Sequence, residues 1–283
     1  MSMSMGGLML RHPWVVLRFC AGYASYFLST VIFVVAGIPL LVVLAPFPRR
    51  RHQVLRTVTH RFLAFFTRGW LPLLGIYRVT EIQGLEQAVS IGPSVWVANH
   101  RGFMDGLLLL GLAPGTGVVI KARDTKQPMY AMLARHFDLV SVDRNSVQSV
   151  AASVEKSRRL LAQGRRLLVF PEGTRARNGR LQRFNRLAFD LAVESGVPVV
   201  PILIHSTEPF MAKLPGSFFP VRPNRYRIRF LEPILMKPDE NPGELSDRVY
   251  RDMAGHLRAL DAGTTWENLG VEATRRISTG DRR

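Results

Sequence analysis

The sequence predicts an α/β domain with a mixed, mostly parallel sheet flanked by helices, preceded by an N-terminal helical segment that associates with a membrane. Two patterns favour the α/β domain: short apolar runs alternate with longer amphipathic stretches from Val79 onward, and Arg225 to Leu231 alternates arginine with apolar residues. A third pattern indicates the membrane segment, because the twenty-seven residues from Phe19 to Ala45 include no charged side chain. We therefore expect anchoring helices in 1–78, one folded domain in 79–262 and a polar, mobile tail in 263–283.

Composition narrows the class of protein and the kind of partner. The chain has 283 residues, of which 47% are hydrophobic, so it can bury a large core and is not disordered. Its formal net charge of +17 favours anionic partners such as a phospholipid surface, a phosphate-bearing substrate, an acidic carrier or nucleic acid. Because Cys20 is the single cysteine, neither a disulfide framework nor a cysteine metal site is possible.

The uncharged segment from Phe19 to Ala45 is expected to lie in hydrocarbon. As a helix it would be about 40 Å long, whereas the apolar core of a bilayer is roughly 30 Å thick, so it must tilt, kink at Pro39 or form a hairpin within one leaflet. It is too long for the apolar region of a cleaved signal peptide. The alternative is a buried core helix of a soluble protein.

The distribution of arginines predicts how the chain is oriented. Only Arg11 and Arg18 closely precede the apolar core of this segment, whereas the stretch after it carries many more, namely Arg49, Arg50, Arg51, Arg56, Arg61 and Arg68. The positive-inside rule therefore places the following domain in the cytoplasm, at the inner membrane.

A second apolar stretch, Phe62 to Ile76, is interrupted by Arg68, Gly69 and Pro72. It is too short and too broken to span a bilayer. We expect a helix in the headgroup layer, where aromatic and guanidinium groups are both well placed, or a helix packed against the folded domain. One helix could both lie in the headgroup layer and pack against the folded domain.

The remaining elements follow from hydrophobic periodicity. The expected strands are Val95–Ala98, Val118–Ile120, Leu139–Val142, Leu167–Phe170, Val199–Ile204 and Arg225–Leu231, the last with one buried face and one basic face. The expected helices are Gly106–Leu112, Met129–His136, Val150–Ala162, Phe184–Ser195 and Glu244–Leu260. Gly164 and Gly196 stand where two of these helices need a left-handed C-terminal cap.

The strongest functional signal is the stretch Asn99-His100-Arg101-Gly102-Phe103-Met104-Asp105. On one continuous helix, positions five apart are separated by roughly 140°, so His100 and Asp105 would not meet. We expect the chain to turn here, with Asp105 in the first turn of the following helix. A carboxylate beside one ring nitrogen leaves the other nitrogen free to accept a proton, which makes the pair a candidate general base.

A second motif, Phe170-Pro171-Glu172-Gly173-Thr174-Arg175, leaves a predicted strand through a turn. Open α/β sheets bind ligands at the carboxyl ends of their strands. Exposed backbone amides and a guanidinium group at that edge suit a phosphate.

Together, these motifs and the later Val197-Pro198-Val199-Val200-Pro201 closely resemble the glycerolipid acyltransferase family, specifically the 1-acylglycerol-3-phosphate acyltransferases. The resemblance covers roughly Val79 to Leu235 and implies the fold of that family. It implies that His100 is the general base and that Asp105 orients it. It also implies a set of residues that bind the glycerophosphate substrate: Arg101, Lys121, Arg144, Glu172, Gly173, Thr174 and Arg175.

The implied reaction transfers a fatty acyl group from acyl-CoA or acyl carrier protein to the free hydroxyl of 1-acylglycerol-3-phosphate, giving phosphatidate in phospholipid biosynthesis. A thioester is already activated, so the acceptor hydroxyl needs only a base. No covalent intermediate is expected, since the sequence has no Gly-x-Ser-x-Gly motif. We expect no cofactor and no metal, because the other histidines lack ligand spacing. The expected partners are the bilayer, the lysophospholipid and the acyl donor, not nucleic acid.

Two alternatives remain open. Commoner members of the family read Lys-x-Glu-Leu where this chain reads Lys121-Ala122-Arg123-Asp124, so the acceptor could be another lysolipid, such as a lyso-ornithine lipid. The remote alternative is a non-catalytic basic protein that binds a membrane surface or nucleic acid.

Overall fold

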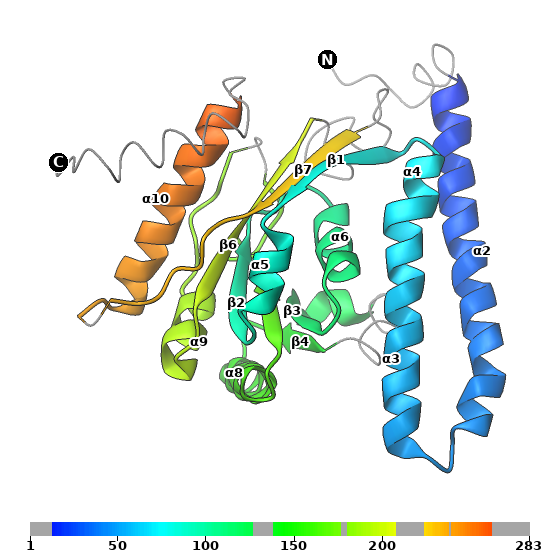
Figure 1. Cartoon of the computed structure of the whole chain (residues 1–283), viewed down its shortest axis with the longest axis horizontal. Coiled ribbons are helices and arrows are strands. Elements are labelled where there is room, and N and C mark those ends of the chain that lie inside the picture. The colour runs from blue at the N-terminus through cyan, green and yellow to red at the C-terminus, as the bar shows by residue number, and fades with distance from the viewer. Residues whose placement is uncertain (1–12, 127–137, 177–179, 208–223, 238, 262–283) are drawn as a thin grey trace.

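The computed structural model describes residues 13–126, 138–176, 180–207, 224–237 and 239–261. Its centre is a 7-stranded sheet in the order β1-β7-β6-β2-β5-β3-β4, with helices on both faces (Figure 1). The strands are β1 (Tyr77–Gln83), β2 (Ser94–Ala98), β3 (Thr116–Lys121), β4 (Leu139–Val142), β5 (Arg166–Val169), β6 (Val199–Ser206) and β7 (Asn224–Phe230). The predicted mixed, mostly parallel sheet is confirmed.

Helices precede, separate and follow these strands. They are α2 (Pro13–Val43), α3 (Pro48–Phe65), α4 (Leu71–Leu73), α5 (Leu85–Ser90), α6 (Met104–Leu112), α8 (Val147–Ala162), α9 (Leu187–Ser195) and α10 (Pro242–Asp261). A π-helical turn, Phe66–Trp70, joins α3 to α4, and a 3₁₀ turn, Ala122–Lys126, follows β3. The expected helix Met129–His136 and the expected tail in 263–283 lie outside the described residues.

Strand directions bring one set of strand ends to a single edge. Strands β2, β3, β4, β5 and β6 form parallel pairs, whereas β7 is antiparallel to β6 and parallel to β1. The carboxyl ends of the parallel strands therefore meet at the same edge, where α/β sheets bind ligands. Strand β1 was not among the expected strands, and it begins at Tyr77, slightly before Val79.

The sheet separates two hydrophobic cores. In β2, Trp96 belongs to the core that also holds Leu63 of α3 and Leu108 of α6. The neighbouring Val95 belongs to the core that holds Phe189 of α9 and Val249 of α10. Because successive side chains of a strand point to opposite faces, α3 and α6 cover one face of the sheet and α9 and α10 cover the other.

Local signals explain where the helices begin and end. Helix α8 starts at Val147, earlier than the expected Val150, because Ser146 caps it by accepting a hydrogen bond from the Ser149 amide at 3.2 Å. Gly164 and Gly196 have φ angles of 76° and 62°, which confirms the predicted left-handed caps. Helix α9 begins only at Leu187, after the expected Phe184.

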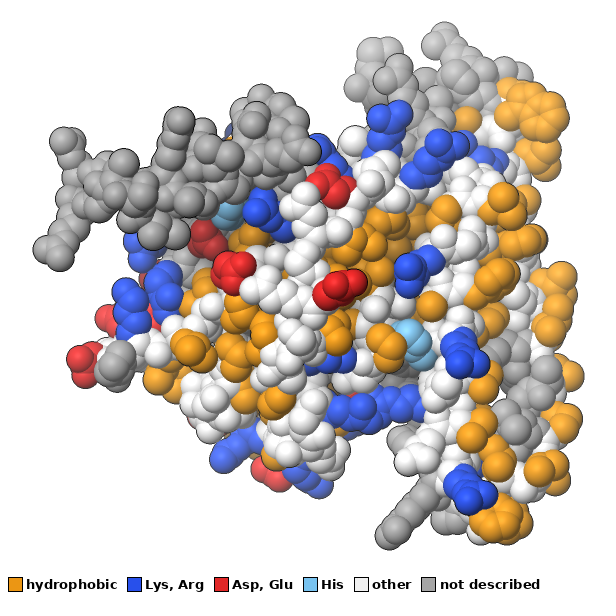
Figure 2. All heavy atoms as spheres, in the orientation of Figure 1, with side chains coloured by type: hydrophobic (Ala, Val, Ile, Leu, Met, Phe, Trp, Pro, Cys, Tyr) orange, Lys and Arg blue, Asp and Glu red, His pale blue; other side chains and the backbone are white. Residues whose placement is uncertain are grey.

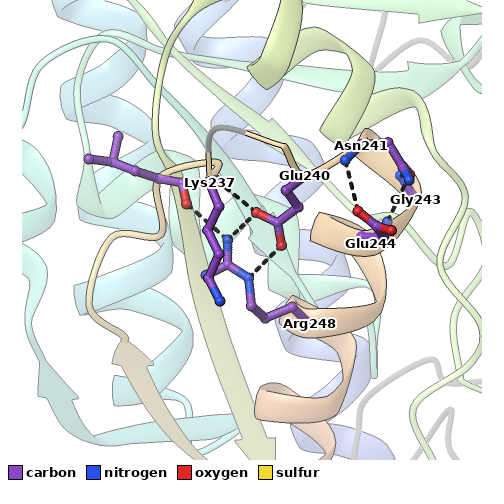
Figure 3. A network of polar contacts seen from close by, with 7 residues as sticks. Lys237, Glu240, Asn241, Gly243, Glu244 and Arg248 are labelled. Atoms are coloured by element: carbon purple, nitrogen blue, oxygen red, sulfur yellow. Dashed lines mark hydrogen bonds and ion pairs between the residues drawn. The ribbon is translucent and has the colours of Figure 1, made fainter.

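Helix α10 is fixed at its start by a polar network (Figure 3). The Asn241 side chain accepts hydrogen bonds from the amides of Gly243 and Glu244, and Glu244 accepts one from the Asn241 amide, which is a capping box. Arg248 donates from Nε and Nη2 to the two carboxylate oxygens of Glu240, at 2.7 and 2.6 Å. This network sets the position of α10 against the sheet.

The N-terminal helices α2 and α3 run antiparallel beside each other (Figure 1). Val15 and Phe19 of α2 are buried, and the Trp70 indole donates to the Ser25 hydroxyl at 2.9 Å. Helix α2 continues through Pro39, so the segment does not form a hairpin by itself; the turn comes after Val43 and α3 makes the second arm. Within the described residues, no helix combines the length and the apolar character that crossing a membrane would require.

The outward surface of α2 is apolar. Figure 2 shows hydrophobic side chains along the outer side of the α2–α3 pair. The large hydrophobic side chains of α2 that remain exposed are Trp14, Leu17, Tyr23, Phe27, Leu28, Val31, Ile32, Val35, Val42 and Val43. A cluster of exposed apolar side chains of this kind marks an interaction site in a soluble environment or at a membrane.

Helix α3 packs closely on α6, as one of the two expectations for Phe62 to Ile76 requires. A Cβ atom on Gly111 of α6 would lie 2.7 Å from the Thr67 hydroxyl and 3.6 Å from Cα of Ala64. The absence of a side chain at Gly111 therefore allows the two segments to approach. Leu63 and Phe66 fill the rest of this contact and are buried.

We expect Gly111→Ala to lower the free energy of unfolding by about 1–3 kcal/mol, because the added methyl group overpacks the contact with Thr67. Gly255 of α10 is the matched control, since a Cβ there meets nothing within 4 Å. Gly255→Ala should leave stability unchanged or raise it by about 0.5–1 kcal/mol through helix propensity. Urea unfolding of both variants measures these changes in the free energy of unfolding. Equal changes at the two glycines would contradict the close contact at Gly111.

Candidate active site

His100 and Asp105 meet at the turn between β2 and α6. Nδ1 of His100 lies 2.9 Å from Oδ2 of Asp105, whose side chain is fully buried. The same oxygen accepts hydrogen bonds from the backbone amides of Arg101 and Gly102, at 2.6 and 2.8 Å. Three donors thus fix the carboxylate opposite the imidazole. With Nδ1 donating to Asp105, Nε2 is the nitrogen that can accept a proton.

Asn99 holds the start of this turn against β6. Its side-chain amide donates to the Ile204 carbonyl at 2.9 Å, and its side-chain oxygen accepts from the Ile204 amide at 2.7 Å. The side chain therefore takes the place of a backbone partner for β6, while the backbone turns away toward His100. Asn99 belongs to the predicted motif, but its sequence context predicts no role for it, because its partner lies 105 residues away.

The segment around the Pro-Glu-Gly turn forms hydrogen bonds with both the amide and the carbonyl group of His100. Oε1 of Glu172 accepts from the His100 amide at 2.7 Å, and the Ala176 amide donates to the His100 carbonyl at 2.7 Å. The Phe170 ring stacks on the imidazole, with 4.3 Å between ring centroids. The two motifs that the sequence analysis treats separately are therefore one structural unit.

Gly173 is required where the turn meets Arg144. Its φ of 61° lies in the left-handed region, and a Cβ there would lie 2.9 Å from Cζ of Arg144 and still closer to Nη2. Any side chain at this position would displace the guanidinium group. The turn thus presents its backbone and the Arg144 side chain together.

Glu172 is held by backbone groups rather than by side chains. Its second oxygen, Oε2, accepts from the Gln182 amide at 2.8 Å, and the residue is 8% exposed. Burial raises the pKa of Glu172 to about 7, although the two backbone donors act in the opposite direction. An ionised carboxylate accepts these two hydrogen bonds more strongly than the neutral acid does, which is why the donors oppose the rise in pKa.

This pKa predicts how stability depends on pH. The pKa of Glu172 is raised from 4.5 to about 7 on folding, so the folded protein binds more protons than the unfolded chain between these values. The stability contributed by this group is fully present below the lower value and is lost as the pH rises through about 7. The loss amounts to at most about 3 kcal/mol, because one pKa unit corresponds to about 1.4 kcal/mol.

Urea unfolding of the wild type and of Glu172→Gln, each measured across this pH range, isolates the effect from other titrating groups. The free energy of unfolding of the wild type should fall relative to that of the variant as the pH rises. If the free energies of unfolding of the two proteins differed by the same amount at every pH, the raised pKa would be contradicted.

A cavity of about 190 Å³ opens beside His100 at the carboxyl edge of the sheet. Its polar part includes the side chains of Lys121, Arg123, Arg144 and Arg175, with Asp124 as the acidic residue. Its apolar part is formed mainly by α6 and the strands β3 and β4: Phe103, Leu107, Leu110, Val118, Ile120, Leu139 and Val142. A ligand with an anionic head and an apolar chain fits this division.

The predicted substrate-binding residues fall into two groups. Lys121, Arg144, Gly173, Thr174 and Arg175 line the same cavity as His100. Arg101 and Glu172 do not line it: Arg101 is 8% exposed and donates to the Ser206 carbonyl at 3.4 Å, and Glu172 holds the backbone. Among the described residues, no group of three or more His, Cys, Asp or Glu side chains could hold a metal ion. The roles of all these residues stay predictions.

Comparisons with known proteins identify relatives of this chain. A sequence model of the family described as Acyltransferase matches residues 79–205. The 1-acyl-sn-glycerol-3-phosphate acyltransferase alpha of Bos taurus is 34% identical over 185 residues, which are 64% of this chain and 63% of the relative. The chain thus spans slightly less than two thirds of the length of that relative.

Two further proteins cover more of the chain. A Caenorhabditis elegans protein, provisionally named a 1-acyl-sn-glycerol-3-phosphate acyltransferase, is 31% identical over 229 residues, which are 78% of this chain and 76% of that protein. The crystal structure of PlsC, a 1-acyl-sn-glycerophosphate acyltransferase from Thermotoga maritima, superposes with a TM-score of 0.69 at 24% identity. It covers 90% of this chain and 98% of the other.

Proposed function

The chain belongs to the acyltransferase family that includes the 1-acyl-sn-glycerol-3-phosphate acyltransferases, and from this premise we propose that it acylates the free hydroxyl of 1-acylglycerol-3-phosphate to give phosphatidate. One observation carries the proposal: His100, which is paired with the buried Asp105, lines a cavity that has Lys121, Arg144 and Arg175 at its polar part and apolar side chains at the other. The cations suit the phosphate of the acceptor, and the apolar wall suits an acyl chain.

The geometry supports general-base catalysis. Nε2 of His100 accepts the proton of the acceptor hydroxyl while the hydroxyl oxygen attacks the thioester carbonyl carbon. The resulting tetrahedral species re-forms the carbonyl and breaks the carbon–sulfur bond. The imidazolium then returns its proton to the departing thiolate. Asp105 holds Nδ1 throughout and stabilises the imidazolium, so no covalent acyl-enzyme is formed.

Asp124 supports one alternative acceptor. Its carboxylate faces the same cavity and lies 3.7 Å from Nε of Arg123. A carboxylate there would repel a phosphate but would attract the amine of a lyso-ornithine lipid. The mechanism at His100 would be the same for both acceptors.

A panel of lysolipid acceptors tests the function directly. The purified protein is assayed with one acyl-CoA and 1-acylglycerol-3-phosphate, lyso-ornithine lipid or a neutral monoacylglycerol. We expect the largest kcat/KM with 1-acylglycerol-3-phosphate. A preference for the ornithine lipid would move the proposal to that acceptor, and no transfer to any of the three would overturn it.

We further propose that the protein attaches to the cytoplasmic face of the membrane through the apolar surface of α2. The exposed side chains of α2 and the arginines at the start of α3, such as the exposed Arg50, support this arrangement. Attachment along the helix places the cavity close to the lipid from which the acceptor comes.

Replacing Phe27, Ile32 and Val35 with Gln should therefore weaken binding to anionic liposomes by at least about tenfold, since each buried side chain of this type contributes about 1.5–3 kcal/mol. These residues are 72%, 57% and 58% exposed. The matched control replaces Val147, Leu235 and Met236, which are exposed elsewhere, with Gln. Flotation of both variants measures the effect. Equal losses would show that α2 has no special role.

A further inference from the structure

Three arginines project from the segment between the Pro-Glu-Gly turn and α9. Arg180, Arg183 and Arg186 are all exposed. Arg186 lies 3.4 Å from Asp190, a pair that is itself open to solvent. Within the part of the chain that the structure describes, neither Arg180 nor Arg183 forms an ion pair. The segment therefore carries an excess of accessible positive charge, and we call these three residues the arginine rim.

The residues between these arginines are anchored. The Leu181 carbonyl accepts a hydrogen bond from the Tyr250 hydroxyl at 3.5 Å, and the Gln182 amide donates to Glu172 at 2.8 Å. Phe184 is buried, with its ring 5.1 Å from that of Tyr250. Every third residue of this segment is an arginine, and the residues between them are anchored by hydrogen bonds or by burial. The guanidinium groups therefore project from a fixed backbone. Ordering them on a partner costs less entropy than ordering a free loop.

The arginine rim lies beside the cavity but does not line it. Asn185 and Leu187, which flank Arg186, contribute to the cavity wall, whereas the three arginines do not. They are exposed and lie next to residues of the cavity wall. A partner that bound them would therefore lie at the border of the cavity that His100 lines.

The rim also lies on the side of the sheet away from the apolar surface of α2. Phe184 belongs to the core beneath α9 and α10, whereas the core on the opposite face includes Phe19 of α2 and Leu63 of α3. A membrane that covered α2 would leave the arginine rim facing solution. A lipid surface is therefore not the partner that this position favours.

We propose that the arginine rim is the docking surface for an acidic carrier protein that presents the acyl thioester to the cavity. This inference rests on the proposed acyltransferase function and names the donor. Phosphate groups of a nucleotide are bound by donors that converge in a pocket, whereas separated, exposed cations outside the cavity suit the acidic surface of a protein. The cations that line the cavity are the ones proposed to bind the acceptor. Lipid and donor thus approach from opposite faces of the sheet.

The test compares two donors on matched variants. One variant carries Arg180→Gln, Arg183→Gln and Arg186→Gln. The control carries Arg158→Gln, Arg159→Gln and Arg258→Gln, which remove the same charge from exposed positions on α8 and α10. Acyl transfer is measured with acyl carrier protein and with acyl-CoA at low and high salt. The rim variant should lose about tenfold or more in the ratio of kcat/KM for the carrier donor to that for acyl-CoA, mainly through KM.

The expected loss shrinks at high salt, and the control keeps the wild-type ratio. An unchanged ratio in the rim variant, or an equal change in the control, would overturn the proposal. If the wild type transferred from neither donor, the proposed function would fail instead. Docking would then be decided by fluorescence anisotropy with labelled, acyl-free carrier protein, which the rim variant should bind at least about tenfold more weakly. Weakened flotation on anionic vesicles without weakened carrier binding would assign the rim to lipid and overturn the proposal.

Discussion

Replacement of His100 with Ala should lower kcat/KM for acyl transfer by about 10²- to 10⁴-fold, the usual cost of losing a general base. The variant keeps the acceptor and donor surfaces, but no group remains that could accept the hydroxyl proton at this position. The loss should appear mainly in kcat, because the imidazole is needed in the transition state rather than for binding. A radiolabelled or mass-spectrometric assay of the acylated product measures it.

His256→Ala is the matched control. His256 lies on α10, 3.5 Å from Asp252, and does not line the cavity. This variant should keep wild-type turnover. Both variants should bind liposomes as the wild type does, since the proposed attachment lies in α2. Wild-type turnover in the His100 variant would remove the imidazole from the mechanism.

Arg175→Ala should lower kcat/KM with 1-acylglycerol-3-phosphate by about tenfold to several hundredfold, or about 1.5–3 kcal/mol. The guanidinium group lines the cavity beside Arg144 and can hold a phosphate through a charge-assisted, two-pronged contact. Arg175→Lys should recover only part of the activity, because an ammonium group cannot form that fork. The effect should follow the phosphate, so transfer to a neutral monoacylglycerol should change little.

The competing explanation is that Arg175 supports the turn. In that case Arg175→Ala would lose activity equally on both acceptors and would also lower the melting temperature, Tm. Measuring both acceptors and Tm on one preparation separates the two roles. An equal loss with a lowered Tm would end the assignment to phosphate.

Local patterns were enough to predict much of the fold and the central pair of the site. The strand Leu139–Val142 has the predicted bounds, and the other five expected strands occur with small shifts at their ends. The contact between His100 and Asp105 also followed from spacing, because only a turn could bring these two side chains together. Such features depend on residues that are close in the sequence.

The features that escaped prediction depend on distant partners. Asn99 acts through Ile204, and Gly173 makes room for Arg144, so neither contact leaves a local pattern. Strand β1 was missed because a register shift between Val79 and Glu81 interrupts its alternation. The apolar segment from Phe19 to Ala45 was interpreted from its length, its lack of charged side chains and the arginines around it, whereas in the structure its first part packs on the domain as one arm of a helical pair.

The hydrogen bonds between the Pro-Glu-Gly segment and the His100 backbone affect how this enzyme could be redesigned. The segment that carries Arg175 also supplies the Glu172 side chain and the Ala176 amide that hold His100 in place. A library that randomised this segment to change headgroup selectivity would shift the His100 imidazole as well. Substitutions in this segment would therefore change headgroup selectivity and the rate of acyl transfer together. To transfer the headgroup preference of one relative to another, the segments Asn99 to Asp105 and Phe170 to Arg175 should be exchanged together.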